Sequence, residues 1–281
     1  MTTDTANFDN PLILAIETSG RLGSVALAHG DKLLSETSFS GPMRHSAEIF
    51  PAITHLLGRF NKKPDQIEHI YISAGPGSFT GLRIAVTLAK TMALANDAKI
   101  VAVDTLDCIA ANVINLACTP NAERCSLLLP NERLATILDA KRGQFFIAVY
   151  ESVSQSDLSL RAKRSNLNQL RTKHSKLKTD CPLSTTRYPL IKILPDCLMT
   201  PEEFLARFSD KLTALIGEGL VFYKDKFTNP NIRVLDEKFW NPSAANIHRL
   251  GWQLALQRQF ADPLTLTPNY IRGPDAIVKQ R

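Results

Sequence analysis

The sequence AGPGSFTGLRIAVTLAKTMALA occupies residues 74–95 and joins a glycine-rich turn to a long apolar helical pattern. It directly follows IEHIYIS (67–73), an apolar run that is typical of a buried strand. Backbone N–H groups at the start of a helix attract anions, so a glycine-rich turn between a strand and a helix often holds a phosphate. The stretch therefore predicts an α/β fold and raises the question of whether the turn binds phosphate.

The glycine spacing of this turn matches neither common phosphate motif. A dinucleotide fingerprint needs G-x-G-x-x-G, but after Gly75 and Gly77 the third position is Thr80, and Gly81 comes one residue late. A P-loop needs a lysine after its last glycine, and Leu82 stands there. Two interpretations remain open, a purely structural turn and a turn whose N–H groups still accept an anion.

The order of apolar patterns in the first half predicts three strands followed by alternating helices and strands. The three strands lie in PLILAIETS (11–19), GSVALAH (23–29) and KLLSETS (32–38). A helical stripe then appears in HSAEIFPAITHLLGRF (45–60), interrupted by Pro51. After the glycine turn and its helix come KIVAVDT (99–105) and LDCIAANVINLA (106–117), a further strand and helix.

The second half repeats this order loosely, which predicts a duplicated α/β fold. Its strands and helices are expected in ATILDA (135–140), QFFIAVYE (144–151), PLIKIL (189–194), TPEEFLARF (200–208), LTALIGEG (212–219) and SAANIHRLGWQLALQRQF (243–260). We therefore expect a flexible N-terminal tail over 1–10, a first half over 11–118, a connection over 119–133 and a second half over 134–281.

The net charge of +6 belongs mainly to one segment. Residues 152–180 hold seven Lys and Arg but only two Asp and Glu, with few large apolar side chains. Such a stretch buries too little surface to offset its ordering entropy, so we expect a surface insertion, open to disorder, at about 152–190. Its charge leaves two interpretations, a solvated loop and a contact for nucleic acid.

Cysteine usage and hydropathy indicate a reducing, cytoplasmic setting. The five cysteines are odd in number and none are paired as C-x-x-C, which favours neither a disulfide framework nor a zinc site. No stretch reaches the roughly 18 continuous apolar residues of a transmembrane helix. Residues 1–10 lack the basic and apolar regions of a signal peptide.

Candidate catalytic and metal-binding groups are few. His45 opens a helical stretch, but a zinc-binding helix would place a second His four residues on, where Ile49 stands. No G-x-S-x-G elbow is present. Glu17, Asp104 and Asp139 each close a predicted strand, where catalytic carboxylates occur but where plain turns use the same residues.

Six segments together resemble the bacterial TsaB family, the dimerisation subunit of the tRNA threonylcarbamoyladenosine complex. They are ILAIETSGRLGSVAL (13–27), HSAEIFPAITHLL (45–57), AGPGSFTGLRIAVTLAKTMALA (74–95), VDTL (103–106), ILDAKRGQFFIAVYE (137–151) and PNYIR (268–272). The resemblance implies an actin/Hsp70/sugar-kinase-like (ribonuclease H-like) fold of two similar halves. The catalytic relative TsaD binds a metal through a helical H-x-x-x-H, and Ile49 stands where its second His would be.

The resemblance implies a non-catalytic scaffold. The complex of this family transfers threonylcarbamoyl from threonylcarbamoyl-adenylate to the adenosine 3′ of the tRNA anticodon. The implied partners are the catalytic subunit TsaD, the P-loop ATPase subunit TsaE and tRNA as substrate, with a homodimer left open and no membrane contact. No cofactor or metal is implied, because the family's D-x-G phosphate loop here begins with Glu17. Weak vestigial nucleotide binding stays open.

In this family the partner is met through the two helices of the first half, which map to about 44–60 and 79–95. The expected interface residues are His45, Ile49, Ile53, Leu56, Leu57, Leu82, Arg83, Val86, Ala89 and Ala93. A relic anion site is expected at Thr18, Ser19, Gly75, Gly77, Ser78 and Phe79, and GEGL (217–220) is at most a remnant of an adenosine loop. Two alternatives remain, an ATP-dependent small-molecule kinase or ATPase of the same fold, and a peptidase of the old glycoprotease grouping.

Overall fold

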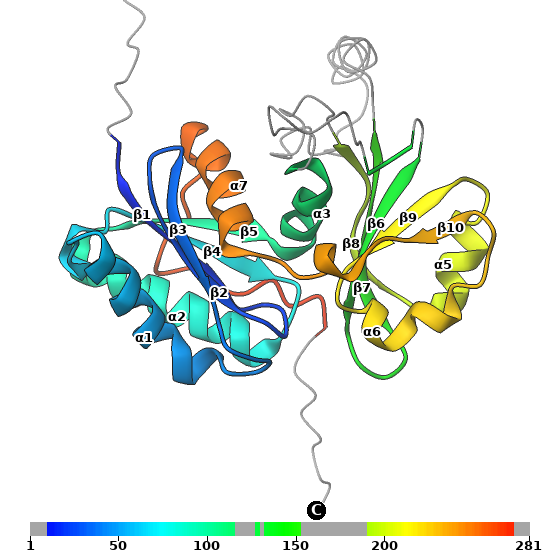
Figure 1. Ribbon diagram of the computed structural model, residues 1–281, viewed down its shortest axis with the longest axis horizontal. Helices are drawn as coiled ribbons and strands as arrows, with labels where there is room; N and C mark the ends of the chain where they lie inside the picture. The colour runs from blue at the N-terminus through cyan, green and yellow to red at the C-terminus, as the bar shows by residue number, and fades with distance from the viewer. Residues whose placement is uncertain (1–9, 116–126, 130–131, 153–189, 273–281) are drawn as a thin grey trace, which may run out of the picture. The chain divides into compact units, whose positions relative to one another are not determined.

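The computed structural model describes residues 10–115, 127–129, 132–152 and 190–272. The chain divides into two compact units, the first formed by Met1–Cys108 with Asn241–Arg281 and the second by Ile109–Trp240 (Figure 1). Nearly all of the predicted tail 1–10, most of the connection 119–133 and the basic insertion at about 152–190 lie outside the described residues. Those three assignments stay predictions.

The first unit is built on a five-stranded mixed sheet with the order β3-β2-β1-β4-β5. β1 pairs antiparallel with β2 and parallel with β4, so the sheet changes direction at its centre. The strands are β1 Leu12–Glu17, β2 Ser24–His29, β3 Lys32–Ser38, β4 His69–Gly75 and β5 Lys99–Asp104. The predicted strand meander and the later strands are all present.

The second unit repeats the same sheet, with the order β10-β9-β6-β7-β8. β6 is the topological equivalent of β1, since it pairs antiparallel with β7 and parallel with β9. The strands are β6 Arg133–Asp139, β7 Phe145–Ser152, β8 Leu190–Met199, β9 Thr213–Ile216 and β10 Ile232–Val234. This identity of strand order confirms the predicted duplicated α/β fold.

Helices cover both faces of the first sheet. α1 (His45–Arg59) and α2 (Phe79–Asn96) lie on one face, and α7 (Ala244–Leu256) lies on the other (Figure 1). A short 3-10 turn, η1 (Pro64–Gln66), precedes β4, and α3 (Thr105–Asn115) follows β5. Within the described part of the chain, no helix is long and apolar enough to cross a membrane.

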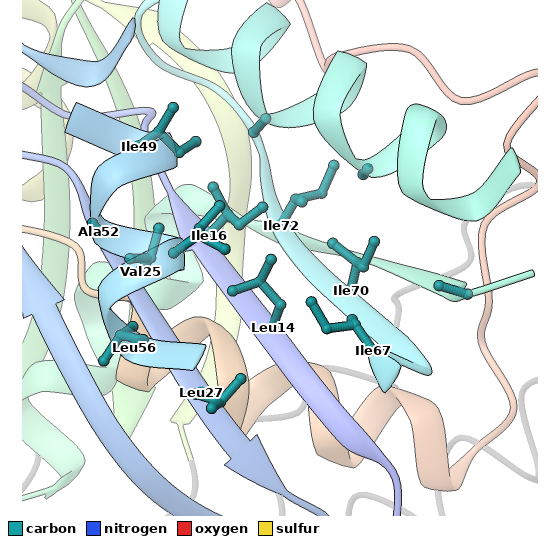
Figure 2. Packing of buried hydrophobic residues seen from close by; sticks show 14 of the residues in the cluster. Leu14, Ile16, Val25, Leu27, Ile49, Ala52, Leu56, Ile67, Ile70 and Ile72 are labelled. Atoms are coloured by element: carbon teal, nitrogen blue, oxygen red, sulfur yellow. The ribbon is translucent and has the colours of Figure 1, made fainter. Parts of the chain in front are cut away.

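Alternate residues of the central strands serve the two covered faces. Leu14 and Ile16 of β1 and Ile70 of β4 point into the cluster under α1 and α2 (Figure 2). Tyr71, the next residue of β4, stacks on His248 of α7 with ring centroids 6.4 Å apart. A sheet buried on both faces requires continuous apolar strands, which explains why these runs lack the polar alternation of a one-sided sheet.

The second unit carries shorter helices. They are α5 Pro201–Phe208, α6 Leu220–Tyr223, η4 Lys224–Lys226 and η5 Glu237–Phe239. α5 begins where the sequence predicted, with a capping box in which Thr200 accepts from the backbone N–H of Glu203. Its Phe204 packs edge-on against Phe145 of β7 and Phe227, which ties the helix to the sheet.

The C-terminal segment differs from the sequence-based boundaries. The expected second half ran to residue 281, yet the compact unit that contains Asn241–Arg281 is the first one. The physical reason is that α7 covers the otherwise bare face of the first sheet. It is fixed there by hydrogen bonds from the Ala244 N–H to Ser24 Oγ at 2.8 Å and from His248 Nε2 to the Gly30 carbonyl at 2.8 Å.

Candidate functional site

Two turns meet at the carboxyl ends of the parallel strands in the first unit. The turn after β1 lies against the glycine turn after β4, where the Ser78 N–H donates to the Ser19 carbonyl at 2.8 Å. The Thr18 hydroxyl donates to the Gly81 carbonyl at 2.8 Å. In open α/β sheets this edge is the usual place for a ligand, so what fills it decides what the fold can bind.

The chain's own backbone fills the space beside the turn glycines. A Cβ on Gly81 would lie 1.8 Å from the Thr18 carbonyl oxygen, and a Cβ on Gly77 would lie 2.6 Å from that of Ser19. These glycines therefore allow one turn to approach the other. The geometry favours the structural interpretation of the GPGSFTGLR turn over an open phosphate cradle.

A buried carboxylate occupies N–H groups that an external anion would need. Glu17 Oε1 accepts from the Ser19 N–H at 2.5 Å, from the Ser19 hydroxyl at 2.5 Å and from the Gly20 N–H at 3.3 Å. Asx-type and helix-start turns present such N–H groups to anions, and here the acceptor is a side chain of the protein itself. A phosphate would have to compete with a side chain held by three hydrogen bonds.

Burial also changes the charge of Glu17. The side chain is 0% exposed, and desolvation raises its pKa to about 7 against the opposing effect of its hydrogen bonds to Ser19 and Gly20. Its Oε2 has no hydrogen-bond partner among the residues that the structure describes. Near neutral pH a large fraction of this group is protonated, which suits a structural acid more than a metal ligand.

His45 is held as a neutral structural residue. Its Nε2 donates to the Gly20 carbonyl at 3.0 Å, and its ring lies 5.8 Å from that of Phe39. Burial lowers its pKa, so the imidazole is uncharged at neutral pH. Across the described residues, no group of three His, Cys, Asp or Glu side chains could hold a metal ion.

The six residues of the predicted relic anion site come only partly together. Thr18, Ser19, Gly77 and Ser78 lie in the two contacting turns, where the N–H groups of Ser19 and Ser78 already donate within the protein. Ser78 caps α2, as predicted, by accepting from the Gly81 N–H at 3.4 Å. The anion site remains a prediction. Because the N–H groups of Ser19 and Ser78 are engaged within the protein, fewer backbone N–H groups are left for an anion than the sequence suggests.

Most of the predicted interface residues are buried in the free chain. Nine of the ten are buried inside the first unit, and only Arg83 is exposed. The buried nine are His45, Ile49, Ile53, Leu56, Leu57, Leu82, Val86, Ala89 and Ala93. They form the stripe that packs on the chain's own sheet, because each helix must first cover that sheet. Ile49 and Arg83 of the predicted set also line the groove beside this stripe, and the interface itself stays a prediction.

That groove, of about 490 Å³, lies between α1 and α2 and is lined by the neighbouring stripe of each helix. On α2 its residues recur at helical spacing, one position out of phase with the buried stripe. The lining residues are Ser46, Ile49, Phe50, Phe79, Thr80, Arg83, Ile84, Thr87, Leu88 and Thr91. The spacing of 80, 84, 87 and 91 was visible in the sequence, but only the sheet reveals which stripe stays outside.

The chemistry of this groove suits a protein partner. Phe50 is 61% exposed and Phe79 is 40% exposed, which is unusual for phenylalanine in a folded unit. Arg83 is its only charged lining residue, and the remaining polar ones are hydroxyl side chains, whose desolvation costs less than that of charges. Exposed aromatic residues beside an arginine are typical of protein-binding surfaces.

Comparison with known proteins agrees with this architecture. The family model described as "TsaD: tRNA N6-adenosine threonylcarbamoyltransferase" matches residues 39–170. The chain is 34% identical over 139 residues to the tRNA threonylcarbamoyladenosine biosynthesis protein TsaB of Bacillus subtilis. That match covers 50% of this chain and only 55% of the Bacillus protein. The protein of the same name from Haemophilus influenzae is 22% identical over 94% of both chains.

Solved structures extend the likeness to the whole fold. A structure described as YeaZ from Pseudomonas aeruginosa superposes with a TM-score of 0.66 at 18% identity, covering 92% of this chain and 99% of that one. A second Pseudomonas structure, described as similar to peptidase YEAZ, gives the same TM-score and covers 93% and 100%. At this identity the likeness concerns the fold alone. Together, these findings show that the chain is similar to TsaB proteins in sequence and to the YeaZ structures in fold.

Proposed function

We propose that this chain takes part in tRNA threonylcarbamoyladenosine biosynthesis as a non-catalytic scaffold subunit. Its relatives are named as TsaB biosynthesis proteins of this modification, which supports the pathway. In the proposal it docks the catalytic subunit TsaD through the exposed stripes of α1 and α2. TsaD then transfers threonylcarbamoyl from threonylcarbamoyl-adenylate to tRNA, and TsaE acts as the ATPase subunit.

The observation that carries the proposal is the exposed apolar groove between α1 and α2. Phe50 and Phe79 are large side chains left in water beside the otherwise well-packed first unit. Burying each against a partner would contribute up to about 1.5–3 kcal/mol before ordering costs. A partner that covers both helices would complete the packing that the sheet provides on the opposite side.

The turns that follow β1 and β4 support a chain that catalyses no reaction at the sheet edge where this fold class usually binds ligands. Glu17 engages the N–H groups of Ser19 and Gly20, and Gly81 is packed on the Thr18 carbonyl. A nucleotide triphosphate needs free N–H groups or cations at this place. The turns favour a role as scaffold for α2 over a role in phosphoryl transfer.

The basic segment at about 152–190 is a second element of the proposal. Its clustered Lys and Arg match the phosphate backbone of tRNA in charge. Deleting residues 155–180 should weaken the tRNA affinity of the reconstituted complex at low salt and flatten its salt dependence. Unchanged affinity would remove the segment from the proposal and leave the scaffold role intact.

Co-expression with TsaD of the same organism, followed by size-exclusion chromatography with light scattering, tests the scaffold role. We expect a stable complex that contains one or more copies of each chain. A chain that elutes alone at micromolar concentration, as monomer or homodimer, would contradict the proposal. A homodimer formed through the same groove would instead support self-association as the function of this face.

A further inference from the structure

The last described segment of the chain, residues 261–272, returns across the first unit after α7 ends; we call it the C-terminal strap. It begins beside β5, where the Ala261 N–H donates to the Ile100 carbonyl at 2.8 Å. Leu266 packs against the core cluster beneath α1 and α2. The strap is thereby guided to the face of the sheet that carries these two helices.

The strap then contacts the glycine turn directly. The Asn269 N–H donates to the Ala74 carbonyl at 2.7 Å, at the end of β4. Gly75 has φ +116°, and a Cβ there would lie 2.7 Å from the Asn269 carbonyl oxygen. A glycine at position 75 therefore meets two demands at once, a backbone conformation that other residues rarely adopt and close approach of the strap.

One residue further on, the strap reaches the groove residues. The Tyr270 ring lies 5.0 Å from that of Phe79, the first residue of α2. Arg83, one turn into the helix, places its guanidinium 5.3 Å from the same Phe79 ring. Phe79 and Arg83 both line the groove, so Tyr270 supports the groove from outside it.

We propose that the C-terminal strap positions Phe79 and Arg83 for partner binding, with Tyr270 as the positioning residue. This inference rests on the proposed function, because it assigns a second chain segment to the same docking surface. An exposed phenylalanine at a helix start has several rotamers open to it, and fixing one of them on binding costs entropy. Contact with Tyr270 restricts that choice before the partner arrives.

The strap is well suited to this task because it is separable from the core. Half of its twelve residues are exposed, and Leu264 is 79% exposed. Segments with few buried apolar contacts open locally at lower free energy than the whole domain. Loss of the Tyr270 ring should therefore loosen the groove without unfolding the first unit.

Three variants test the inference against the purified catalytic subunit TsaD by isothermal titration calorimetry. Tyr270→Ala should weaken binding about two- to ten-fold, which is what one aromatic pair contributes. Tyr270→Phe keeps the ring and should bind as the wild type does. Leu264→Ala removes another exposed side chain of the same strap, 79% exposed, and should also bind like the wild type.

Hydrogen exchange of the free chain gives a readout that does not depend on the partner. Residues 74–83 should exchange faster in Tyr270→Ala than in the wild type, while the thermal midpoint stays within a few degrees. Wild-type affinity in Tyr270→Ala, or unchanged exchange over 74–83, would overturn the inference and leave the scaffold role standing. If the wild-type chain does not bind TsaD, the proposed function itself fails, and the partner-binding role of the strap fails with it.

Discussion

Glu17 lies at the carboxyl end of β1, on the edge where sheets of this class bind their ligands. Its carboxyl group accepts hydrogen bonds from the turn that follows the strand, including the N–H groups of Ser19 and Gly20. A longer acid than aspartate has the reach to fold back on its own turn. The N–H groups of this turn are therefore already engaged by the chain's own carboxyl group, which disfavours a phosphate site beside Gly77.

Glu17→Gln tests this description through the pH dependence of stability. The folded pKa of about 7 lies above the reference value of 4.5, so the stability is fully present below about pH 4.5 and is lost as pH rises through 7. The loss should reach about 3 kcal/mol. Glutamine offers the same acceptor oxygen and does not ionise. Denaturant unfolding from pH 5 to 8 should show a flatter profile in the variant, and an unchanged profile would contradict the burial of an ionisable group here.

A pair of glycine substitutions tests the close contact of the two turns. Gly81→Ala should destabilise the protein by about 2–3 kcal/mol, because the added Cβ meets the Thr18 carbonyl oxygen at 1.8 Å. Gly58 lies in α1 with nothing within 4 Å of an added Cβ, so Gly58→Ala should stabilise by about 0.5–1 kcal/mol. Thermal unfolding of both variants gives the comparison. Equal effects of the two changes would show that the turns can separate at little cost.

For α2, the helical period of the apolar residues predicted some properties of the helix and not others. Its existence, its start after Ser78 and its apolar character followed from the sequence. The sequence did not predict which face of α2 packs on the sheet, because both apolar stripes of the helix have the same period of 3.6 residues. The structure turns Ala85 and Ala89 to the sheet, where small side chains permit close packing, and leaves Ile84 and Leu88 on the groove side. Which stripe is buried depends on the sheet beneath it, and the helix sequence does not contain that information.

The capping box of α5 gives an element-scale prediction in the second unit. Thr200 and Glu203 each accept from the other's backbone N–H, at 3.2 Å and 2.8 Å. Thr200→Ala should lower the free energy of unfolding by about 1 kcal/mol, whereas Thr200→Ser retains the acceptor and should be nearly neutral. Chemical denaturation measures both. A neutral Thr200→Ala would mean that α5 is held by Phe204 and its aromatic neighbours alone.

At the scale of the whole chain, the duplicated strand order was predictable and the path of the C-terminus was not. Apolar runs in the same order predicted the strands from β1 to β5 and from β6 to β9, whereas the short strand β10 was not predicted. The return of α7 to the first unit depends on which sheet has an uncovered face, a tertiary property. The strap that follows it was visible only as the motif PNYIR (268–272), with no assigned contact.

The occupied turns also predict how the whole chain responds to nucleotides. Titration of the full chain with ATP and Mg²⁺ up to millimolar concentration should show no saturable binding, because Glu17 already engages the N–H groups of its turn. Isothermal titration calorimetry measures this directly. Affinity in the micromolar range would favour the alternative of an ATP-dependent kinase or ATPase of the same fold.

We infer that the exposed stripe of α1 and α2 is the docking face, and a matched pair of variants on these two helices tests this inference. Thr87 lines the groove, while Thr54 of α1 is also exposed but lies outside the groove lining. Thr87→Arg would bury an unpaired charge in the complex and should weaken TsaD binding at least about ten-fold, as measured by calorimetry. Thr54→Arg should bind like the wild type. Wild-type affinity in Thr87→Arg would show that TsaD does not dock on this groove.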